Sequence, residues 1–460
     1  MMNFTTIREL LDHALKNFAD APAISEKTAD GYRKTSYAQL ISDVKKAASV
    51  LIAKGLTGKH IGITGINSRL WAIAYYAVTA FTGVAVPLPG ELTEAQIEPL
   101  IAGADIDAVI SDRSLSLSVP VIPMECLTEG ETEAEDAYVP APEDIAEMIF
   151  TSGTTSVPKC VPLTHANIIS IASCEFTAYA GHVSICVLPL HHAFEEVCHL
   201  LVAPAIGMEL YMCPSIRLFP VMVAESGCDA LYLVPALADA LLTRFGRFLD
   251  KAEKLDRVVC GGAPIPQALV DAYAARGVKL YGGYGLSECS PLVSLNVDLI
   301  PGSCGRIGSY CRVRIDPDGE IQVQGKNVFG GYYKNDAATK AAFTEDGWLK
   351  TGDLGRLDSE NHLFITGRIK NLIILSNGEN VSPEEIEVLI VNALSGQADA
   401  LVYDAGDKLG AKIYAPGLNE ESVRKAISDL NPTLPPYQRI MKIDVTEEPL
   451  PVNATGKKVR

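Results

Sequence analysis

The chain has 460 residues, enough for two or more domains with sizeable cores. Hydrophobic residues make up 48% and charged residues 21%, a balance typical of folded globular proteins rather than disordered ones. The formal net charge of −17 argues against non-specific nucleic-acid binding, so any anionic substrate must be held by local lysines, arginines and backbone amides.

The alternation of helical and strand patterns predicts the architecture. We expect helices at residues 6–18, 37–54, 68–81 and 164–173, and strands at 60–64, 84–86, 108–111, 184–188, 230–234 and 257–260. This rhythm indicates βαβ units, with mainly parallel sheets and helices on both faces. Residues 71–88 carry no charge and approach the length of a membrane span, but Gly83 and Pro87 interrupt them, so no transmembrane segment is expected.

The pattern changes from residue 307. Strands at 313–315 and 320–323 flank an Asp-Pro-Asp-Gly turn, which predicts a β-hairpin at the start of a β-rich subdomain. A second boundary falls at residues 368–371, followed by a strand at 372–375 and a helix that opens at Ser382. There, Ser382 as N-cap, Pro383 at N1 and Glu385 at N3 fit a helix start.

The eleven cysteines are scattered without a C-x-x-C pair, which argues against a structural zinc site and a disulfide framework. The first residues show no secretory leader pattern. We therefore expect free thiols in a reducing cytoplasm.

A run of small residues follows the apolar segment 145–150, namely Thr151, Ser152, Gly153, Thr154, Thr155 and Ser156, with Lys159 shortly after. Small residues let the backbone approach an anion, and their N–H and O–H groups donate to phosphate oxygens. The run therefore predicts a loop for the triphosphate of a nucleotide, although the Walker A pattern does not occur in the sequence. A polar surface loop between strand and helix is the alternative reading.

Four further segments follow in order: Tyr-Gly-Gly-Tyr-Gly-Leu-Ser-Glu at 281–288, Trp-Leu-Lys-Thr-Gly-Asp at 348–353, Gly-Arg-Ile-Lys-Asn at 367–371 and Pro-Val-Asn-Ala-Thr-Gly-Lys at 451–457. Each is weak alone. In this order and spacing they resemble the adenylate-forming (AMP-binding) superfamily of acyl-CoA synthetases, luciferases and peptide-synthetase adenylation domains. The resemblance implies an α/β fold with a large N-terminal domain, residues 1–369, of mainly parallel βαβ sheets plus a β-rich subdomain. A small mobile α+β domain, residues 370–460, would close the active-site cleft.

The resemblance also implies roles for the nucleotide site. The 151–156 loop and Lys159 would wrap the β- and γ-phosphates, Ser287 would donate to the adenylate phosphate, and Glu288 would hold Mg²⁺. Adenine and ribose contacts would come from Gly262, Ala263, Pro264, Tyr284, Asp353 and Arg368. Read without the resemblance, Tyr284 is a core aromatic and the charged members are solvated surface residues. Ser156 and Cys160 stand where glycine is usual, and Ser287 where threonine is usual.

The C-terminal residues would act in two successive arrangements. Lys457 would bridge the substrate carboxylate and the α-phosphate, although a lysine so near a terminus is ordinarily frayed. Lys370 would be the hinge. After rotation, Gly378, Glu379 and Asn380 would line a tunnel for the thiol; a plain strand-to-helix turn is compatible with this role.

His191 and His192 suggest a metal, but no other ligands lie at suitable spacing. Their context, Leu-Pro-Leu-His-His-Ala-Phe, resembles the family motif beside the acyl pocket, with His192 at the matching position and Gly285 as a further pocket residue. The aspartate that amino-acid-activating relatives carry near this point has no apparent counterpart, which favours a simple carboxylic acid.

These observations predict an AMP-forming acid–thiol ligase that uses Mg²⁺, ATP and coenzyme A. Residues 367–371 and 377–387 most resemble fatty-acyl-CoA synthetases, so we expect a fatty acid, of a chain length that the sequence leaves open. One alternative transfers the acyl group to the phosphopantetheine of an acyl carrier protein. Another is a non-catalytic nucleotide-binding homologue, which Ser156 and Cys160 favour and the retained Glu288, Asp353 and Lys457 oppose.

Overall fold

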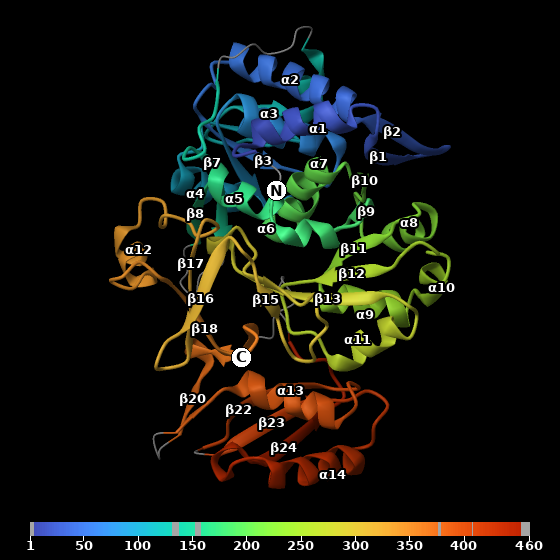
Figure 1. Ribbon diagram of the computed structural model, residues 1–460, viewed down its shortest axis with the longest axis vertical. Coiled ribbons are helices and arrows are strands. Elements are labelled where there is room, and N and C mark those ends of the chain that lie inside the picture. Colours follow the sequence, from blue (N-terminus) through green and yellow to red (C-terminus); the bar gives the residue numbers. More distant parts are fainter. Residues whose placement is uncertain (1–3, 131–137, 152–157, 376–378, 407, 452–460) are drawn as a thin grey trace.

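The computed structural model describes residues 4–130, 138–151, 158–375, 379–406 and 408–451 (Figure 1). They form two large sheets, a three-stranded C-terminal sheet, a two-stranded ribbon and the helices that cover them. The α/β class predicted from the sequence is confirmed.

The first sheet has six strands in the order β6-β5-β3-β4-β7-β8. Its strands are β3 (His60–Thr64), β4 (Val84–Leu88), β5 (Ala108–Ser111), β6 (Val121–Pro123), β7 (Ile145–Thr151) and β8 (Lys159–Thr164). All neighbours run parallel except the last pair, because β8 turns back along β7 as a hairpin.

The second sheet has thirteen strands in the order β16-β17-β18-β19-β15-β14-β13-β12-β11-β9-β10-β1-β2. Its parallel run comprises β1 (Pro22–Thr28), β9 (Val183–Cys186), β10 (Glu209–Met212), β11 (Ala230–Leu233), β12 (Arg257–Cys260) and β13 (Lys279–Tyr284), and β2 (Gly31–Ser36) pairs antiparallel with β1 at one edge. Beyond β13 the pairing is antiparallel through β14 (Ser294–Leu295), β15 (Gly305–Ile307), β19 (His362–Arg368), β18 (Leu349–Leu357), β17 (Glu320–Gly325) and β16 (Cys311–Ile315). The expected β-rich part thus continues the parallel sheet edge to edge, and its hairpin is β16–β17.

The helices of the N-terminal part cover these sheets (Figure 1). They are α1 (Ile7–Phe18), α2 (Tyr37–Ala53), α3 (Arg69–Phe81), α4 (Glu94–Ala104), α5 (His165–Ala172), α6 (Ala193–Glu196), α7 (Val202–Ile206), α8 (Phe219–Glu225), α9 (Pro235–Thr243), α10 (Gly246–Leu249), α11 (Gln267–Ala274) and α12 (Asp336–Ala342). Hydroxyl side chains fix the starts of four of them, since Thr6, Ser36, Ser68 and Thr164 each accept a hydrogen bond from the first-turn backbone.

Helix α3 is the uncharged segment that approached membrane-span length in the sequence. Its residues 71–81 are all buried between α2 and the six-stranded sheet, which explains their apolar character. No helix in the described part of the chain has the length and apolarity needed to cross a membrane.

The C-terminal segment has a hydrophobic core of its own, built from residues 373–445. It contains β20 (Ile373–Ile374), β21 (Asn380–Val381), α13 (Pro383–Ala393), β22 (Asp399–Asp404), β23 (Leu409–Tyr414), α14 (Glu420–Leu430) and β24 (Ile440–Thr446). In Figure 1 it lies below the two large sheets, in orange and red, with α13 facing them. The domain boundary at residue 370 stays a prediction that this separate core supports.

The start of α13 departs in one respect from the sequence expectation. Ser382 occupies the N-cap position, but its side chain makes no cap hydrogen bond. Its hydroxyl instead donates to the carbonyl of Thr366 on β19 at 2.5 Å, and Asn371 donates to Glu384 at 2.5 Å. A tertiary contact between Ser382 and β19 of the thirteen-stranded sheet has replaced local capping.

Candidate active site

The predicted phosphate loop connects the two strands of a hairpin. Thr151 on β7 pairs with Lys159 on β8, and residues 152–157 between them, hence Ser152, Gly153, Thr154, Thr155 and Ser156, lie outside the described residues. The chain therefore returns along β8 before it enters α5, rather than passing directly from strand to helix. Cys160, which stands where the family usually has glycine, is buried among Val86, Leu88 and Met148, so its side chain belongs to the hydrophobic core.

The half-buried side chain of Lys159 contacts an aromatic ring in the loop that follows β17 of the thirteen-stranded sheet. Its Nζ lies 4.5 Å from the ring centroid of Tyr332, a cation–π contact. The hydroxyl of the same tyrosine donates to Oε1 of Glu288 at 2.8 Å. The structure thus brings two predicted ATP ligands to one tyrosine, Lys159 at its ring and Glu288 at its hydroxyl.

Glu288 fits the metal role in its chemistry. It lies in a short 3₁₀ turn, Ser287–Cys289, directly after β13, and is half-buried. Within the described part of the chain only Oε1 accepts a hydrogen bond, from Tyr332, which leaves Oε2 available. A carboxylate oxygen is the ligand type that Mg²⁺ prefers.

Three of the predicted adenine and ribose residues form one connected group. The hydroxyl of Tyr284 donates to Oδ2 of Asp353 at 2.8 Å, and Nε of Arg368 lies 2.8 Å from Oδ1 of the same carboxylate. The β18–β19 register places Asp353 opposite Arg368. Tyr284 and Asp353 are buried, whereas the Arg368 side chain is 40% exposed and can reach a ligand.

The glycine-containing segments lie at the carboxyl ends of neighbouring parallel strands. Gly262, Ala263 and Pro264 follow β12 and are exposed, and Gly285 follows β13. A Cβ at Gly285 would lie 1.6 Å from the carbonyl oxygen of Pro291, so only glycine fits there. In open α/β sheets ligands bind outside the carboxyl ends of parallel strands, which is where these residues lie.

The predicted acyl-pocket histidine lies at the start of α6. His192 is the residue before this helix and is exposed, with its ring 4.2 Å from that of His191. Burial lowers the pKa of His191 to about 3, which keeps that ring neutral. Phe194, two residues further on, packs 3.4 Å from where a Cβ of Gly261 would lie, so α6 borders the end of β12.

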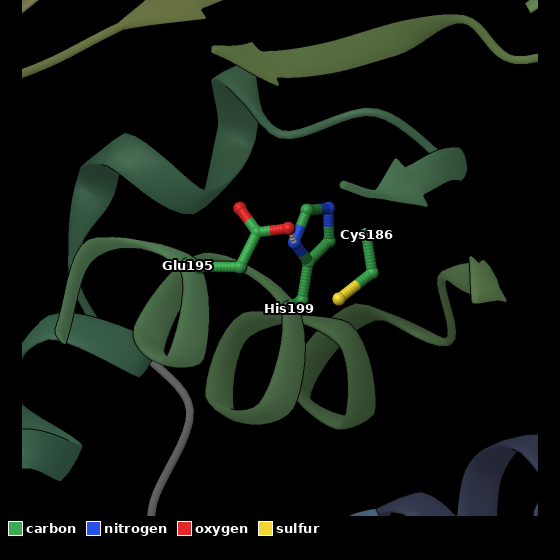
Figure 2. A group of neighbouring side chains, drawn as sticks. All are labelled: Cys186, Glu195 and His199. Atoms are coloured by element: carbon green, nitrogen blue, oxygen red, sulfur yellow. Dashed lines mark ion pairs between the residues drawn. The ribbon is translucent and has the colours of Figure 1, made fainter. Parts of the chain in front are cut away.

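Three potential metal ligands lie together in and next to α6, but neither His191 nor His192 is among them. Cys186, Glu195 and His199 are fully buried and place their ligand atoms within 4.8 Å of one another (Figure 2). Glu195 Oε1 lies 3.1 Å from His199 Nδ1 and accepts from the backbone of Leu188 at 3.0 Å, while His199 Nε2 lies 2.9 Å from Ser184 Oγ. These bonds fasten α6 and the π-helical turn Val197–Leu201 to the end of β9.

A second buried group joins α3, β7 and α6. The hydroxyl of Tyr75 contacts both Glu147, at 3.1 Å, and Glu196. Burial raises the pKa of Glu147 to about 7, and burial together with Glu147 raises the pKa of Glu196 well above its ordinary value. The two carboxyls, which both contact the Tyr75 hydroxyl, therefore share protons at pH values where exposed glutamates are ionised.

The described C-terminal site residues lie in the turn after β19 and at the β20–β21 ribbon. Lys370 is exposed in the 3₁₀ turn Ile369–Asn371, between the two cores. Glu379 and Asn380 are exposed at the β20–β21 ribbon, and β20 lies at the lower left of Figure 1, away from β13. Gly378 and Lys457 lie outside the described residues.

Comparison with known proteins identifies the family of this α/β protein. The model of the AMP-binding enzymes matches residues 11–333, so the chain belongs to that family, as its motifs predicted. It is 28% identical to 4-coumarate–CoA ligase 1 of Arabidopsis thaliana, over 80% of this chain and 73% of the relative. It is also 28% identical to long-chain-fatty-acid–CoA ligase FadD13 of Mycobacterium tuberculosis, over 92% and 91%. ATP-bound MatB from Rhodopseudomonas palustris shares the fold, with a TM-score of 0.85, 24% identity and coverage of 98% and 97%.

Sequence reasoning missed Tyr332 and Thr351. Thr351 donates to the carbonyl of Ile321 at 2.7 Å and accepts from the backbone of Asp353 at 3.1 Å, which orients that carboxylate. It stands inside the Trp-Leu-Lys-Thr-Gly-Asp segment and could have been selected there. Tyr332 follows two glycines, a weak signal, and its importance depends on contacts between three distant segments.

Proposed function

We propose that the protein is an ATP-dependent acid–thiol ligase. The carboxylate of an acid attacks the α-phosphorus of ATP, the bond to pyrophosphate breaks, and acyl-AMP forms. A thiolate then attacks the acyl carbonyl, and AMP leaves with the electron pair of the broken C–O bond. The observation that carries the proposal is the group of Tyr284, Asp353 and Arg368, together with Glu288 and Lys159, which both contact Tyr332.

The first step brings two anions together, so catalysis depends on charge neutralisation and positioning. In a chain of net charge −17 the required cations must be local. Lys159 would face the β- and γ-phosphates, Arg368 the ribose or α-phosphate, and Lys457 the reacting carboxylate. Glu288 would hold Mg²⁺, which neutralises phosphate charge when bound.

We propose a fatty acid as the substrate and coenzyme A as the thiol. The two sequence relatives are named for 4-coumarate and long-chain fatty acids, both of which are carboxylic acids that are joined to CoA. The segments at 367–371 and 377–387 favour the fatty acid, and no aspartate follows His192 to pair with an amino group. Tyr284 would stack on adenine, with Gly262, Ala263 and Pro264 along its other side, and His192 and Gly285 would border the acyl group.

We further propose that residues 370–460 rotate about Lys370 between the two half-reactions. The β20–β21 ribbon that carries Glu379 and Asn380 lies away from β13 in this arrangement, so these residues need a domain movement to reach the acyl-adenylate. The segment has a core of its own, and such a core can move as a unit; among the described residues, Ser382 donates to β19, and Asn371, in the turn after β19, donates to Glu384.

A pyrophosphate-release screen tests the proposal. Acids from acetate to palmitate, together with 4-coumarate, are incubated with the protein, ATP and Mg²⁺, and coenzyme A is then compared with a phosphopantetheinylated carrier protein. Release that depends on a fatty acid and acyl-CoA formation are expected. Release with 4-coumarate alone would refute the fatty acid as the substrate. Acyl transfer only to the carrier protein would refute coenzyme A as the acceptor. No release with any acid would refute ligase activity.

A further inference from the structure

Tyr332 lies between two residues that the proposed function assigns to MgATP. Its hydroxyl donates to Glu288 Oε1 at 2.8 Å, and its ring faces Lys159 Nζ at 4.5 Å. The two partners come from different sheets and are far apart in the chain. A single side chain therefore links the predicted metal carboxylate to the predicted phosphate lysine.

The loop that carries Tyr332 is fixed to both partners' segments through its backbone. The N–H of Phe329 donates to the carbonyl of Glu288 at 3.0 Å, and the N–H of Tyr333 donates to the carbonyl of Cys160, next to Lys159, at 3.0 Å. The N–H of Tyr332 itself donates to Thr339 Oγ1 at 2.9 Å. The tyrosine thus has little freedom to move away from either partner.

The side chain is also held by packing. Its ring makes an edge contact with Phe329, with centroids 4.9 Å apart, and Phe329 is buried against Phe343. The phenol hydroxyl is a hydrogen-bond donor, and Glu288 is the acceptor that it meets. A fixed donor restricts the rotamers of the carboxylate that accepts from it.

We propose that Tyr332 is a positioning residue for MgATP. Its hydroxyl restricts Glu288 so that Oε2 would stay available for Mg²⁺, and its ring holds the ammonium of Lys159, which keeps this cation–π contact while its N–H groups bind a phosphate oxygen. This inference rests on the proposed function, because it takes the metal and phosphate roles of Glu288 and Lys159 from there. Partners that orient a metal-binding carboxylate commonly affect metal affinity about tenfold or more.

Binding of a non-hydrolysable ATP analogue, measured by calorimetry at several Mg²⁺ concentrations without acid or thiol, tests the proposal. Tyr332→Phe retains the ring and removes the hydroxyl, so it should weaken binding about tenfold at limiting Mg²⁺ and less at saturating Mg²⁺. Tyr332→Leu also removes the cation–π contact and should lose further affinity at every Mg²⁺ concentration. The KM for the acid should stay unchanged in Tyr332→Phe, whereas a general packing defect would change it.

Tyr333→Phe is the matched control. It removes a hydroxyl one residue away, which donates to Asp105 at 2.7 Å and contacts neither Glu288 nor Lys159. It should bind MgATP like the wild type. In a Glu288→Gln background, Tyr332→Phe should add little, because the two changes affect one interaction.

Wild-type affinity in Tyr332→Phe, or an equal loss in the Glu288→Gln background, would overturn the positioning role. If the wild type binds MgATP but activates no acid, the ligase proposal fails while the binding data still decide the role of Tyr332. If the wild type does not bind MgATP, both proposals are wrong.

Discussion

The shared proton of Glu147 and Glu196 predicts an unusual pH dependence of stability. An unfolded glutamate releases its proton near pH 4.5, whereas the pKa of Glu147 in the fold is raised to about 7 by burial and that of Glu196 is raised further. Between these values the folded state binds more protons than the unfolded state. The free energy of unfolding therefore falls as the pH rises above 4.5 and continues to fall to about pH 7 and beyond.

The magnitude follows from the pKa of Glu147. A displacement from 4.5 to about 7 corresponds to about 3 kcal/mol of lost stability above pH 7, at roughly 1.4 kcal/mol per pH unit. Glu196→Gln preserves the shape and leaves an amide that donates to Glu147, so the remaining carboxylate can ionise without a like charge beside it. The variant should match or exceed the wild type at pH 8, and its advantage should vanish near pH 4.5.

Urea unfolding at pH 5, 6, 7 and 8 measures this effect. Trp71 stacks on Tyr75 with ring centroids 5.9 Å apart, so its fluorescence reports on this part of the core. In a Trp348→Phe background it is the single tryptophan. Exposed Glu253→Gln serves as the control and should keep the wild-type pH profile. Parallel profiles for Glu196→Gln and the wild type would refute the shared proton.

Four further predictions concern the site. Lys457→Ala should slow acyl-adenylate formation about a hundredfold or more but spare thioester formation from synthetic acyl-AMP; equal losses in the two assays would exclude the assigned role. Glu288→Gln should raise the Mg²⁺ concentration needed for half-maximal pyrophosphate release, and an unchanged titration would rule out the metal role. Lys370→Pro fixes φ at the hinge and should slow thioester formation far more than adenylation in single-turnover assays; full thioester-forming activity would argue against rotation there. Gly285→Ala must displace the Pro291 carbonyl, so it should lower the melting temperature and ATP affinity together, and wild-type values in both would contradict the close approach.

The sequence predicted the elements best where local signals are strong. The strands at 60–64, 108–111 and 257–260 have the expected bounds, and the helices expected from residues 6, 68 and 164 begin one residue later, each after a hydroxyl side chain that caps it. The strand expected at 184–188 ends at Cys186, because Asn67 and Glu195 bind the backbone of Leu188 and turn the chain. Such tertiary bonds leave no periodic trace in the sequence.

The site residues divide in the same way. The motif order was enough to name Tyr284, Asp353 and Arg368, which the fold joins into one group. The carboxyl pair was not predictable, although Glu147 is conspicuous as the one charge in an apolar run. Its partner Glu196 belongs to a helix that meets β7 only in the folded chain, and no spacing rule connects the two.

The described cations of the site are already paired before ATP binds, which bears on how an acidic protein holds a polyanion. Arg368 lies against Asp353, and Lys159 lies on the ring of Tyr332. Each pairing keeps a half-exposed cation extended, and neither buries the charge completely. A phosphate oxygen can therefore bind the N–H groups of Lys159 while its cation–π contact persists, whereas Arg368 can bind a ligand only while Asp353 also retains a partner such as a ribose hydroxyl. Phosphate recognition by Lys159 should thus tolerate changes in Asp353, and ribose recognition should not.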